Sequence, residues 1–296
     1  MLTELRSRIA PEDTANEQLS SRMMTAMRSA VPQDAVSLPT TGRHEFKYLI
    51  RSEMCDDIAA FVVPFLELDK YSQGRPQDSY TVRSVYYDSP SFRCYYEKAN
   101  GNKNRRKYRV RTYNEGAATF LECKQRKGST YTKPKVRLGE EELAALREQR
   151  GIDASIDDPS NVLGQLLLSM DRWECQPTAL VVYDRIAYVY PGQQDMIRVT
   201  FDRNLRGRVF PSLGEIYDEG ELERFLYGWT ILEVKFNDIV PRFFHQLVTK
   251  FSLQRQACSK YGVCVSLLLD EYPTRKRRME SCLRSLRPSH LTGAPY

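Results

Sequence analysis

Between residues 43 and 236, the chain repeatedly alternates apolar residues with charged or polar ones at a period of two. This period predicts β-strands, because successive side chains of a strand point to opposite faces of the sheet. Eight runs show the alternation, at least in part: Arg43–Ile50, Tyr80–Tyr87, Arg105–Thr112, Thr119–Arg126, Tyr131–Leu138, Leu180–Val189, Ile197–Asn204 and Thr230–Phe236.

Helical spacing of apolar residues appears between and after these runs. It predicts helices over Ser52–Glu67, Glu140–Gln149, Val162–Met170 and Pro241–Leu253. Ser52 is the expected N-cap of the first helix, and Pro64 is expected to end or kink it. Pro241 suits the first turn of the last helix.

Strands that are charged on one face and apolar on the other can pack in two ways. A sandwich buries the apolar face and exposes the charged face to water. A closed barrel can do the reverse, with a charged lumen and an apolar outside covered by helices. Alternation alone does not choose, but helices with apolar stripes need a sheet face to cover, which favours the barrel.

Composition divides the chain into three parts. Residues 1–40 are polar and predict a flexible arm with one helix near Glu17–Ser29, residues 41–270 form the folded domain, and residues 271–296 form a basic tail. For that tail, a solvated or helical segment and a nucleic-acid or membrane patch are the alternatives. There is no run of about 18 apolar residues and no secretory segment, and the 7 cysteines are scattered. We therefore expect no transmembrane segment and a cytoplasmic protein.

The net charge of +6 is modest, so the placement of the cations carries more information than their number. Arg105, Lys107, Arg109 and Arg111 share one face of a single predicted strand. Four adjacent cations repel one another unless an anion lies among them. The strand therefore indicates a polyanion-binding site.

Three strands also carry a Glu-x-Lys pair: Glu45 with Lys47, Glu122 with Lys124, and Glu233 with Lys235. Carboxylates bind hard cations such as Mg²⁺ or Mn²⁺, and cationic side chains clamp phosphate oxygens. Together they are typical of a site for a metal-bound polyphosphate. The alternative is ordinary ion pairing across strands on a solvent-exposed sheet face.

Further cations recur at strand positions, namely Lys133, Arg185 and Arg198. Lys260 follows the last predicted helix, where it could instead cap helix carbonyls. The chain contains no GxxxxGK[ST] loop and no GxGxxG motif, which excludes the common nucleotide-binding turns. A nucleic-acid partner is not expected, since Phe46 and Tyr108 lie on the opposite parity from the cations.

Several of these segments, taken in order, resemble a known family. They are Arg43–Tyr48, Arg109–Arg111, Leu121–Lys124, Ser129–Lys133, Tyr183–Arg185, Arg198–Asp202, Leu232–Lys235 and Ser259–Tyr261. From about residue 42 to 270 the chain is similar to the VTC domain, the polyphosphate polymerase domain of the vacuolar transporter chaperone complex, in the CYTH-like triphosphate tunnel superfamily. It contains no region resembling the phosphate-sensing domain or membrane helices of the eukaryotic proteins, so we expect the bacterial stand-alone form.

The resemblance implies an α+β fold, with an eight-stranded antiparallel tunnel, a basic lumen and helices outside. It implies transfer of the γ-phosphoryl group of ATP to inorganic polyphosphate, with Mn²⁺ or Mg²⁺. The phosphate ligands by position are Lys47, Arg109, Arg111, Lys124, Lys133, Arg185, Arg198 and Lys260, and the metal ligands are Glu233, Glu122 and Glu45. A triphosphatase, a nucleotidyl cyclase and a non-catalytic polyphosphate-binding module remain alternatives, and the sequence does not indicate an oligomeric state.

Overall fold

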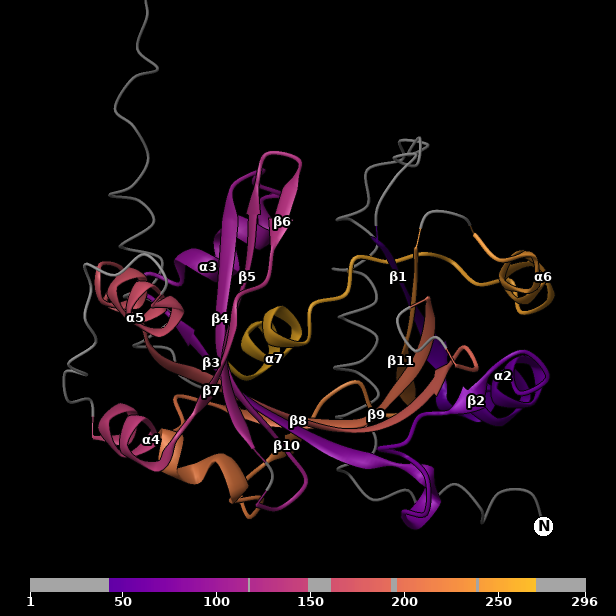
Figure 1. Cartoon of the computed structure of the whole chain (residues 1–296), viewed down its shortest axis with the longest axis horizontal. Coiled ribbons are helices and arrows are strands. Elements are labelled where there is room, and N and C mark those ends of the chain that lie inside the picture. Colours follow the sequence, from indigo (N-terminus) through magenta and orange to yellow (C-terminus); the bar gives the residue numbers. More distant parts are fainter. Residues whose placement is uncertain (1–42, 117, 149–160, 193–195, 238–239, 270–296) are drawn as a thin grey trace, which may run out of the picture. The chain divides into compact units, whose positions relative to one another are not determined.

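The computed structural model describes residues 43–116, 118–148, 161–192, 196–237 and 240–269. In these residues the chain is an α+β protein with six α-helices and a large antiparallel sheet of 11 strands (Figure 1). The chain divides into two compact units. Unit 1 contains residues up to Val82, Val182–Arg206 and Glu223–Ser259, and unit 2 contains Arg83–Val181, Gly207–Leu222 and the residues from Lys260.

Unit 1 is built on four strands in the order β1-β11-β9-β8. Their bounds are β1 Arg43–Arg51, β11 Trp229–Asn237, β9 Ile197–Val209 and β8 Gln176–Val189, and the last residues of β9 and the first of β8 belong to unit 2. Two short strands, β2 Glu67–Leu68 and β10 Glu223–Arg224, pair with β8 and β9. Two helices complete the unit, α2 Cys55–Val62 and α6 Arg242–Lys250.

The two faces of β1, β11 and β9 are chemically opposite. Tyr48, Leu232 and Phe201 are paired across the three strands, and they pack in one core cluster with Ile58 of α2 and Leu247 of α6. Figure 1 shows both helices beside this part of the sheet. Since neighbouring residues of a strand point to opposite faces, the charged positions between these apolar ones face away from the helices.

Unit 2 is built on β3-β4-β5-β6, with β7 also paired to β5. Their bounds are β3 Tyr80–Asp88 (its first three residues in unit 1), β4 Arg105–Tyr113, β5 Thr119–Lys127, β6 Thr130–Thr132 and β7 Lys135–Leu138. Four helices belong to this unit: α3 Arg93–Ala99, α4 Glu140–Arg147, α5 Val162–Asp171 and α7 Lys260–Leu268. Tyr108 and Leu121 on β4 and β5 are fully buried.

The predicted closed barrel is not supported. The order of pairing begins at β1 and ends at β6, and no pairing joins these two strands in the part of the chain that the structure describes. Alternation fixes which side chains share a face, but it does not determine whether the first and last strands meet. The antiparallel sheet and its covering helices are confirmed, and the closure is corrected to an open strand order.

Single elements also differ from the prediction. The run Tyr131–Leu138 is two strands, separated near Pro134, whose carbonyl accepts a hydrogen bond from the amide of Cys123 at 3.0 Å. Ser52 is not the N-cap of α2. It opens a short 3-10 turn, and its hydroxyl bonds the hydroxyl of Thr230 at 3.0 Å.

Two helices, α3 and α7, were not predicted. The whole N-terminal arm, with its predicted helix near Glu17–Ser29, and the basic tail lie outside the described residues. Within the residues described, no helix is both long and apolar enough to cross a membrane.

Candidate functional site

The predicted site residues fall into both units, and each unit gathers its own group of charges. In unit 1 we define the β11 cluster as Glu45, Lys47, Arg185, Arg198, Glu233 and Lys235. In unit 2 we define the β4 cluster as Lys107, Arg109, Arg111, Glu122, Lys124 and Tyr86. Lys133 and Lys260 also belong to unit 2.

The centre of the β11 cluster is an alternating set of carboxylates and ammonium groups. Pairing of β1 with β11 places Lys47 opposite Glu233 and Glu45 opposite Lys235. Nζ of Lys47 lies 3.4 Å from Oε2 of Glu233 and also contacts Glu45, while Lys235 contacts the other oxygen of Glu233. Glu233 is only 5% exposed. Ion pairing across strands, the alternative to a ligand site, is thus present here, and it is centred on a buried carboxylate.

The pKa values of the two lysines in this cluster are shifted in opposite directions. Burial lowers the pKa of Lys47, but the carboxylates of Glu233 and Glu45 outweigh it and raise its pKa above the usual value. For Lys235, burial dominates and lowers the pKa despite Glu233, and Arg185 adds to the lowering. The protonated form of Lys47 is therefore stabilised by its surroundings, whereas the protonated form of Lys235 is destabilised.

Two arginines extend the same cluster. Nε and Nη2 of Arg185 donate to the two carboxylate oxygens of Asp202 at 2.6 and 2.8 Å, and Asp202 is fully buried. Arg198 lies 2.5 Å from a carboxylate oxygen of the buried Asp69 and donates to the hydroxyl of Tyr80 at 3.2 Å. Sequence reasoning did not include Asp69, because a single aspartate after a two-residue strand carries no periodic signal.

A metal ion of the Mg²⁺ or Mn²⁺ kind fits the β11 cluster only in part. Glu45 and Glu233 converge on a single cation, and Thr200, paired opposite Glu233, is 1% exposed with a hydroxyl that makes no hydrogen bond in the described structure. Groups of three or more metal-ligating side chains do not occur among the described residues. This donor set suits Mg²⁺ held by one or two carboxylates with phosphate oxygens and waters, not a closed protein cage.

The β4 cluster is organised by one buried carboxylate. Glu122, which is 2% exposed, accepts from Nε and Nη2 of Arg109 at 2.8 and 2.5 Å, and its other oxygen lies 3.7 Å from Nζ of Lys135. Burial raises the pKa of Glu122, but Arg109, Arg111 and Lys133 lower it to about 2. Glu122 is therefore ionised at neutral pH and is surrounded by cations.

The pKa of Tyr86 reflects the excess positive charge of the β4 cluster. Its ring is almost fully buried, and Nη1 of Arg109 donates to its hydroxyl at 3.4 Å. Burial raises the pKa of Tyr86, but the cations Arg109, Arg111 and Lys107 lower it to about 7. A phenol ionises this readily only where the local potential is strongly positive. Such a potential attracts a phosphate group.

The cationic rows continue along β4 and β5. Arg111 is 7% exposed, and its Nε donates to the hydroxyl of Ser84 at 2.9 Å. Lys107 is paired directly opposite Lys124, so two like charges meet on one face. Lys133 is exposed between β6 and β7 and acts on Glu122 through its charge. The structure thus gathers Arg109, Arg111 and Glu122, with Lys133 at their margin.

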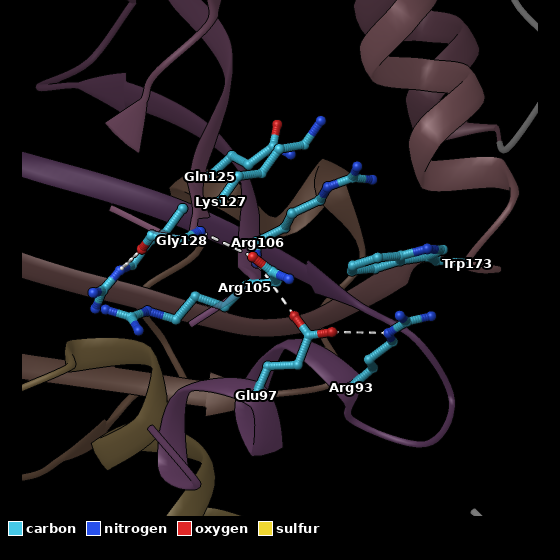
Figure 2. Close-up of a pocket in the computed structure, with 10 residues that line it drawn as sticks. Arg93, Glu97, Arg105, Arg106, Gln125, Lys127, Gly128 and Trp173 are labelled. Atoms are coloured by element: carbon cyan, nitrogen blue, oxygen red, sulfur yellow. Dashed lines mark hydrogen bonds and ion pairs between the residues drawn. The ribbon is translucent and has the colours of Figure 1, made fainter. Parts of the chain in front are cut away.

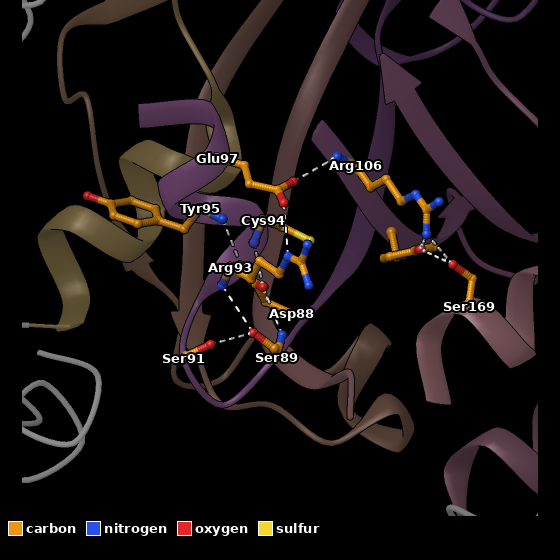
Figure 3. Close-up of polar contacts among 10 residues, drawn as sticks. Asp88, Ser89, Ser91, Arg93, Cys94, Tyr95, Glu97, Arg106 and Ser169 are labelled. Carbon is orange, nitrogen blue, oxygen red and sulfur yellow. Dashed lines mark hydrogen bonds and ion pairs between the residues drawn. The ribbon is translucent and has the colours of Figure 1, made fainter. Parts of the chain in front are cut away.

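Helix α7 connects to this group through stacked rings. Tyr261 stacks on Tyr86 with centroids 5.1 Å apart, and its hydroxyl donates to Asp88 at 2.6 Å. Figure 3 shows the Asp88 carboxylate, which also accepts from the amides of Ser89, Cys94 and Tyr95. These contacts fix the beginning of α3.

Lys260 is the first residue of α7, and α6 ends at Lys250. Lys260 therefore lies at the amino end of a helix of its own, not directly after the carbonyl end of α6. A cation at the first residue of a helix opposes the helix dipole and favours a nearby anion.

Comparison with known proteins gives a family match and fold likenesses. The family model described as VTC domain matches residues 42–269. Solved structures similar to the chain include a protein from Pyrococcus horikoshii OT3, at 15% identity over 78% of this chain and 98% of that one, with a TM-score of 0.38. A putative adenylate cyclase from Bacillus halodurans matches at 13% identity, over 74% and 95%, with a TM-score of 0.42.

A putative adenylyl cyclase from Hippeastrum, described as having a dominant triphosphatase activity, matches at 14% identity over 75% of this chain and 94% of that one, with a TM-score of 0.41. No curated protein matches the chain. Membership of a family therefore rests on the match over residues 42–269.

Proposed function

Because the chain belongs to the VTC domain family, we propose that it is a metal-dependent polyphosphate polymerase. In this proposal it transfers the γ-phosphoryl group of ATP to the end of an inorganic polyphosphate chain. The sequence resemblance supplies the reaction, and the two charged clusters supply chemistry that suits it. Phosphate ligands in the proposal are Lys47, Arg109, Arg111, Lys124, Lys133, Arg185, Arg198 and Lys260.

The observation that carries the proposal is the cationic row of β4, in which Arg111 is buried and Lys107 and Arg109 are partly buried. Lys107, Arg109 and Arg111 together lower the pKa of Tyr86 to about 7, although burial alone would raise it. Glu122 is ionised and offsets only part of this charge, because one carboxylate lies among several cations. A triphosphate carries several negative charges and would neutralise the excess. Donors arranged in advance around developing charge are a main source of catalysis in phosphoryl transfer.

The transfer needs little covalent chemistry from the protein. The bond from the γ-phosphorus to the oxygen bridging it to the β-phosphate breaks, and ADP leaves with that electron pair. A terminal oxygen of the acceptor chain forms the new bond to phosphorus. That oxygen is already ionised, so no general base is required. The planar guanidinium groups of Arg109 and Arg111 suit the spread-out charge of the transferring group.

Glu233 and Glu45 would hold the metal, with Glu122 as a further candidate in the β4 cluster. The bound ion would supply charge neutralisation on phosphate oxygens. Independently of the ion, Lys47 keeps Glu45 and Glu233 within reach of one another, and the hydroxyl of Thr200 beside Glu233 is available to a ligand oxygen.

The decisive experiment is incubation of the purified protein with ATP and Mn²⁺ or Mg²⁺, with ADP, free phosphate and polymer resolved separately. We expect ADP and long polyphosphate to form together. Arg111→Ala and Glu233→Gln are each expected to lower the rate by at least about a hundredfold, the usual cost of removing a group that stabilises transition-state charge. Arg242→Ala and Glu221→Gln, both at exposed positions, are the matched controls.

The other outcomes identify the alternatives. Free phosphate without polymer would make the protein a triphosphatase, with water as the acceptor. Pyrophosphate in place of ADP would make it a nucleotidyl cyclase. Tight binding of triphosphate without turnover would make it a polyphosphate-binding module. If Arg111→Ala and Glu233→Gln both match the controls, the site is misassigned.

A further inference from the structure

Unit 2 also contains a basic pocket, which lies where β4 begins and β5 ends, at the open end of this hairpin. It has a volume of about 460 Å³. Figure 2 shows its ten lining residues, none of which belongs to the site proposed above. The lining is Arg93, Glu97, Asn104, Arg105, Arg106, Gln125, Arg126, Lys127, Gly128 and Trp173. Five cationic side chains thus face one carboxylate.

The single carboxylate is already engaged. Oε1 of Glu97 accepts from Nε of Arg93 at 2.9 Å, and Oε2 accepts from the backbone amide of Arg106 at 3.3 Å (Figure 3). Within the described structure, no carboxylate forms an ion pair with Arg105, Arg106, Arg126 or Lys127. Four cations of the pocket therefore lack a counter-charge from the protein.

The register makes this arrangement costly without a ligand. Arg105 lies directly opposite Arg126, and the next pair on that face is Lys107 opposite Lys124. Like charges directly opposite one another destabilise a strand pair. The guanidinium groups bond only to backbone carbonyls: Arg105 to Asn102 at 2.7 Å and Arg126 to Gly128 at 2.7 Å. These bonds orient the two groups without neutralising them.

The aromatic residue of the pocket determines which kind of anion fits. Trp173 has the guanidinium carbon of Arg93 at 4.0 Å and that of Arg106 at 5.0 Å from its ring centroid. In Figure 2 these groups lie on opposite sides of the indole. Both faces are therefore covered, and no platform remains on which a nucleobase could stack. The pocket offers charge and hydrogen-bond donors but no base-binding surface.

We propose that this pocket binds a chain of condensed phosphate at a subsite separate from the reacting one. Arg105, Arg126 and Lys127 would contact successive phosphate groups, and Arg106 would be oriented by Ser169, whose hydroxyl accepts from its Nη1 at 2.6 Å. The inference rests on the proposed function for the source of the chain, which would be the growing product. Binding itself does not depend on turnover.

Trp173 makes the binding directly measurable. The protein has 2 tryptophans, so Trp229→Phe leaves Trp173 as the sole reporter in the pocket. In this full-length background, without ATP, polyphosphate of several tens of units is titrated at fixed salt while the indole fluorescence is followed. We expect a saturable change. Arg105→Ala/Arg126→Ala should weaken binding at least about tenfold, since hydrogen bonds to charged groups are lost.

The control Arg224→Ala/Arg242→Ala removes the same charge at exposed positions of unit 1, and it should retain the affinity. Without ligand, the pocket variant should have an unfolding midpoint equal to or above that of the parent, because a repelling pair is removed. Lys127→Glu provides a second variant, with the same expected loss of affinity.

Unchanged affinity in both pocket variants would overturn the proposal. The proposal would also be overturned if a single-stranded RNA oligonucleotide bound the Trp229→Phe protein as tightly as polyphosphate does. The pocket would then be a nucleic-acid-binding surface. Failure of polymer synthesis with intact binding would count against the proposed function alone. Synthesis with no fluorescence change would count against this subsite alone.

Discussion

The hydroxyl of Tyr86 lies 3.4 Å from Nη1 of Arg109, in a buried position where three cations lower its pKa to about 7. Its folded pKa is thus below the ordinary tyrosine value of about 10. Ionisation of Tyr86 therefore stabilises the fold above about pH 7, by a margin that grows towards pH 10 and is absent below about pH 7.

We expect an ultraviolet titration to show one phenol ionising near neutral pH. Tyr86→Phe should remove this step, whereas Tyr87→Phe should keep it, since burial raises the pKa of Tyr87. Tripolyphosphate should move the step to higher pH, because a bound anion offsets the cations. A titration with no ionisation below about pH 9 would contradict the positive potential inferred for the β4 cluster.

Glu122→Gln should destabilise the fold by about 2–3 kcal/mol at pH 7, since it leaves the partly buried guanidinium of Arg109 without its charge partner. The folded pKa of Glu122 is about 2, below its usual 4.5, so the carboxylate stabilises the fold above about pH 4.5 and this contribution is lost as pH falls towards 2. Urea unfolding of both proteins across this range measures the effect. Glu221→Gln should be within about 0.5 kcal/mol of wild type at every pH; a similar loss in that variant would show that the effect is not specific to Glu122.

Lys47→Met removes the ammonium group that contacts both Glu45 and Glu233. The two carboxylates then lie near one another without a cation between them. The expected cost is on the order of 3 kcal/mol. Mn²⁺ should then raise the unfolding midpoint of the variant more than that of wild type, because a divalent ion can replace the lost charge. Lys103→Met, in an exposed turn, is the control. Equal metal effects in all three proteins would remove Glu45 and Glu233 as metal ligands.

Tripolyphosphate should stabilise the empty protein strongly, because it relieves the repulsion among Lys107, Arg109 and Arg111. At a concentration one hundred times the Kd the stabilisation is about 2.7 kcal/mol, which corresponds to a rise in Tm of about 5–10 °C. Arg111→Ala should abolish most of the rise, and Arg242→Ala should keep it. Differential scanning calorimetry with and without ligand makes the measurement, and an unchanged midpoint in wild type would refute phosphate binding.

The faces of the strands were predictable from the sequence. Period-two alternation placed Glu45, Lys47 and Glu233 on one face and Tyr48 and Leu232 on the other, and the register bears this out. The prediction succeeded for β1 and β11 because their apolar face packs against α2 and α6, while Lys47 lies opposite Glu233 and Glu45 opposite Lys235. Strand order was not available from this pattern, since hydrogen-bonded partners are chosen in three dimensions.

The two missed helices have specific physical causes. Helix α7 buries Tyr261, Val263, Val265 and Leu268 with little one-sided character, so its pattern does not differ from that of a buried strand. Helix α3 begins after Phe92, whose φ of 57° is left-handed, and its first amides are bonded by Asp88, which lies outside the helix. Neither feature leaves a periodic trace in the sequence.

The register of β1 against β11 has a consequence for how this chain can vary. Shifting either strand by one residue would turn Lys47 and Glu233 towards α2 and α6 and expel Tyr48 and Leu232 from the hydrophobic core. Insertions or deletions of a single residue within these strands should therefore prevent folding, whereas loops outside the strands can change length. Among homologues, we expect gaps to be absent from both strands and to accumulate in loops elsewhere in the chain.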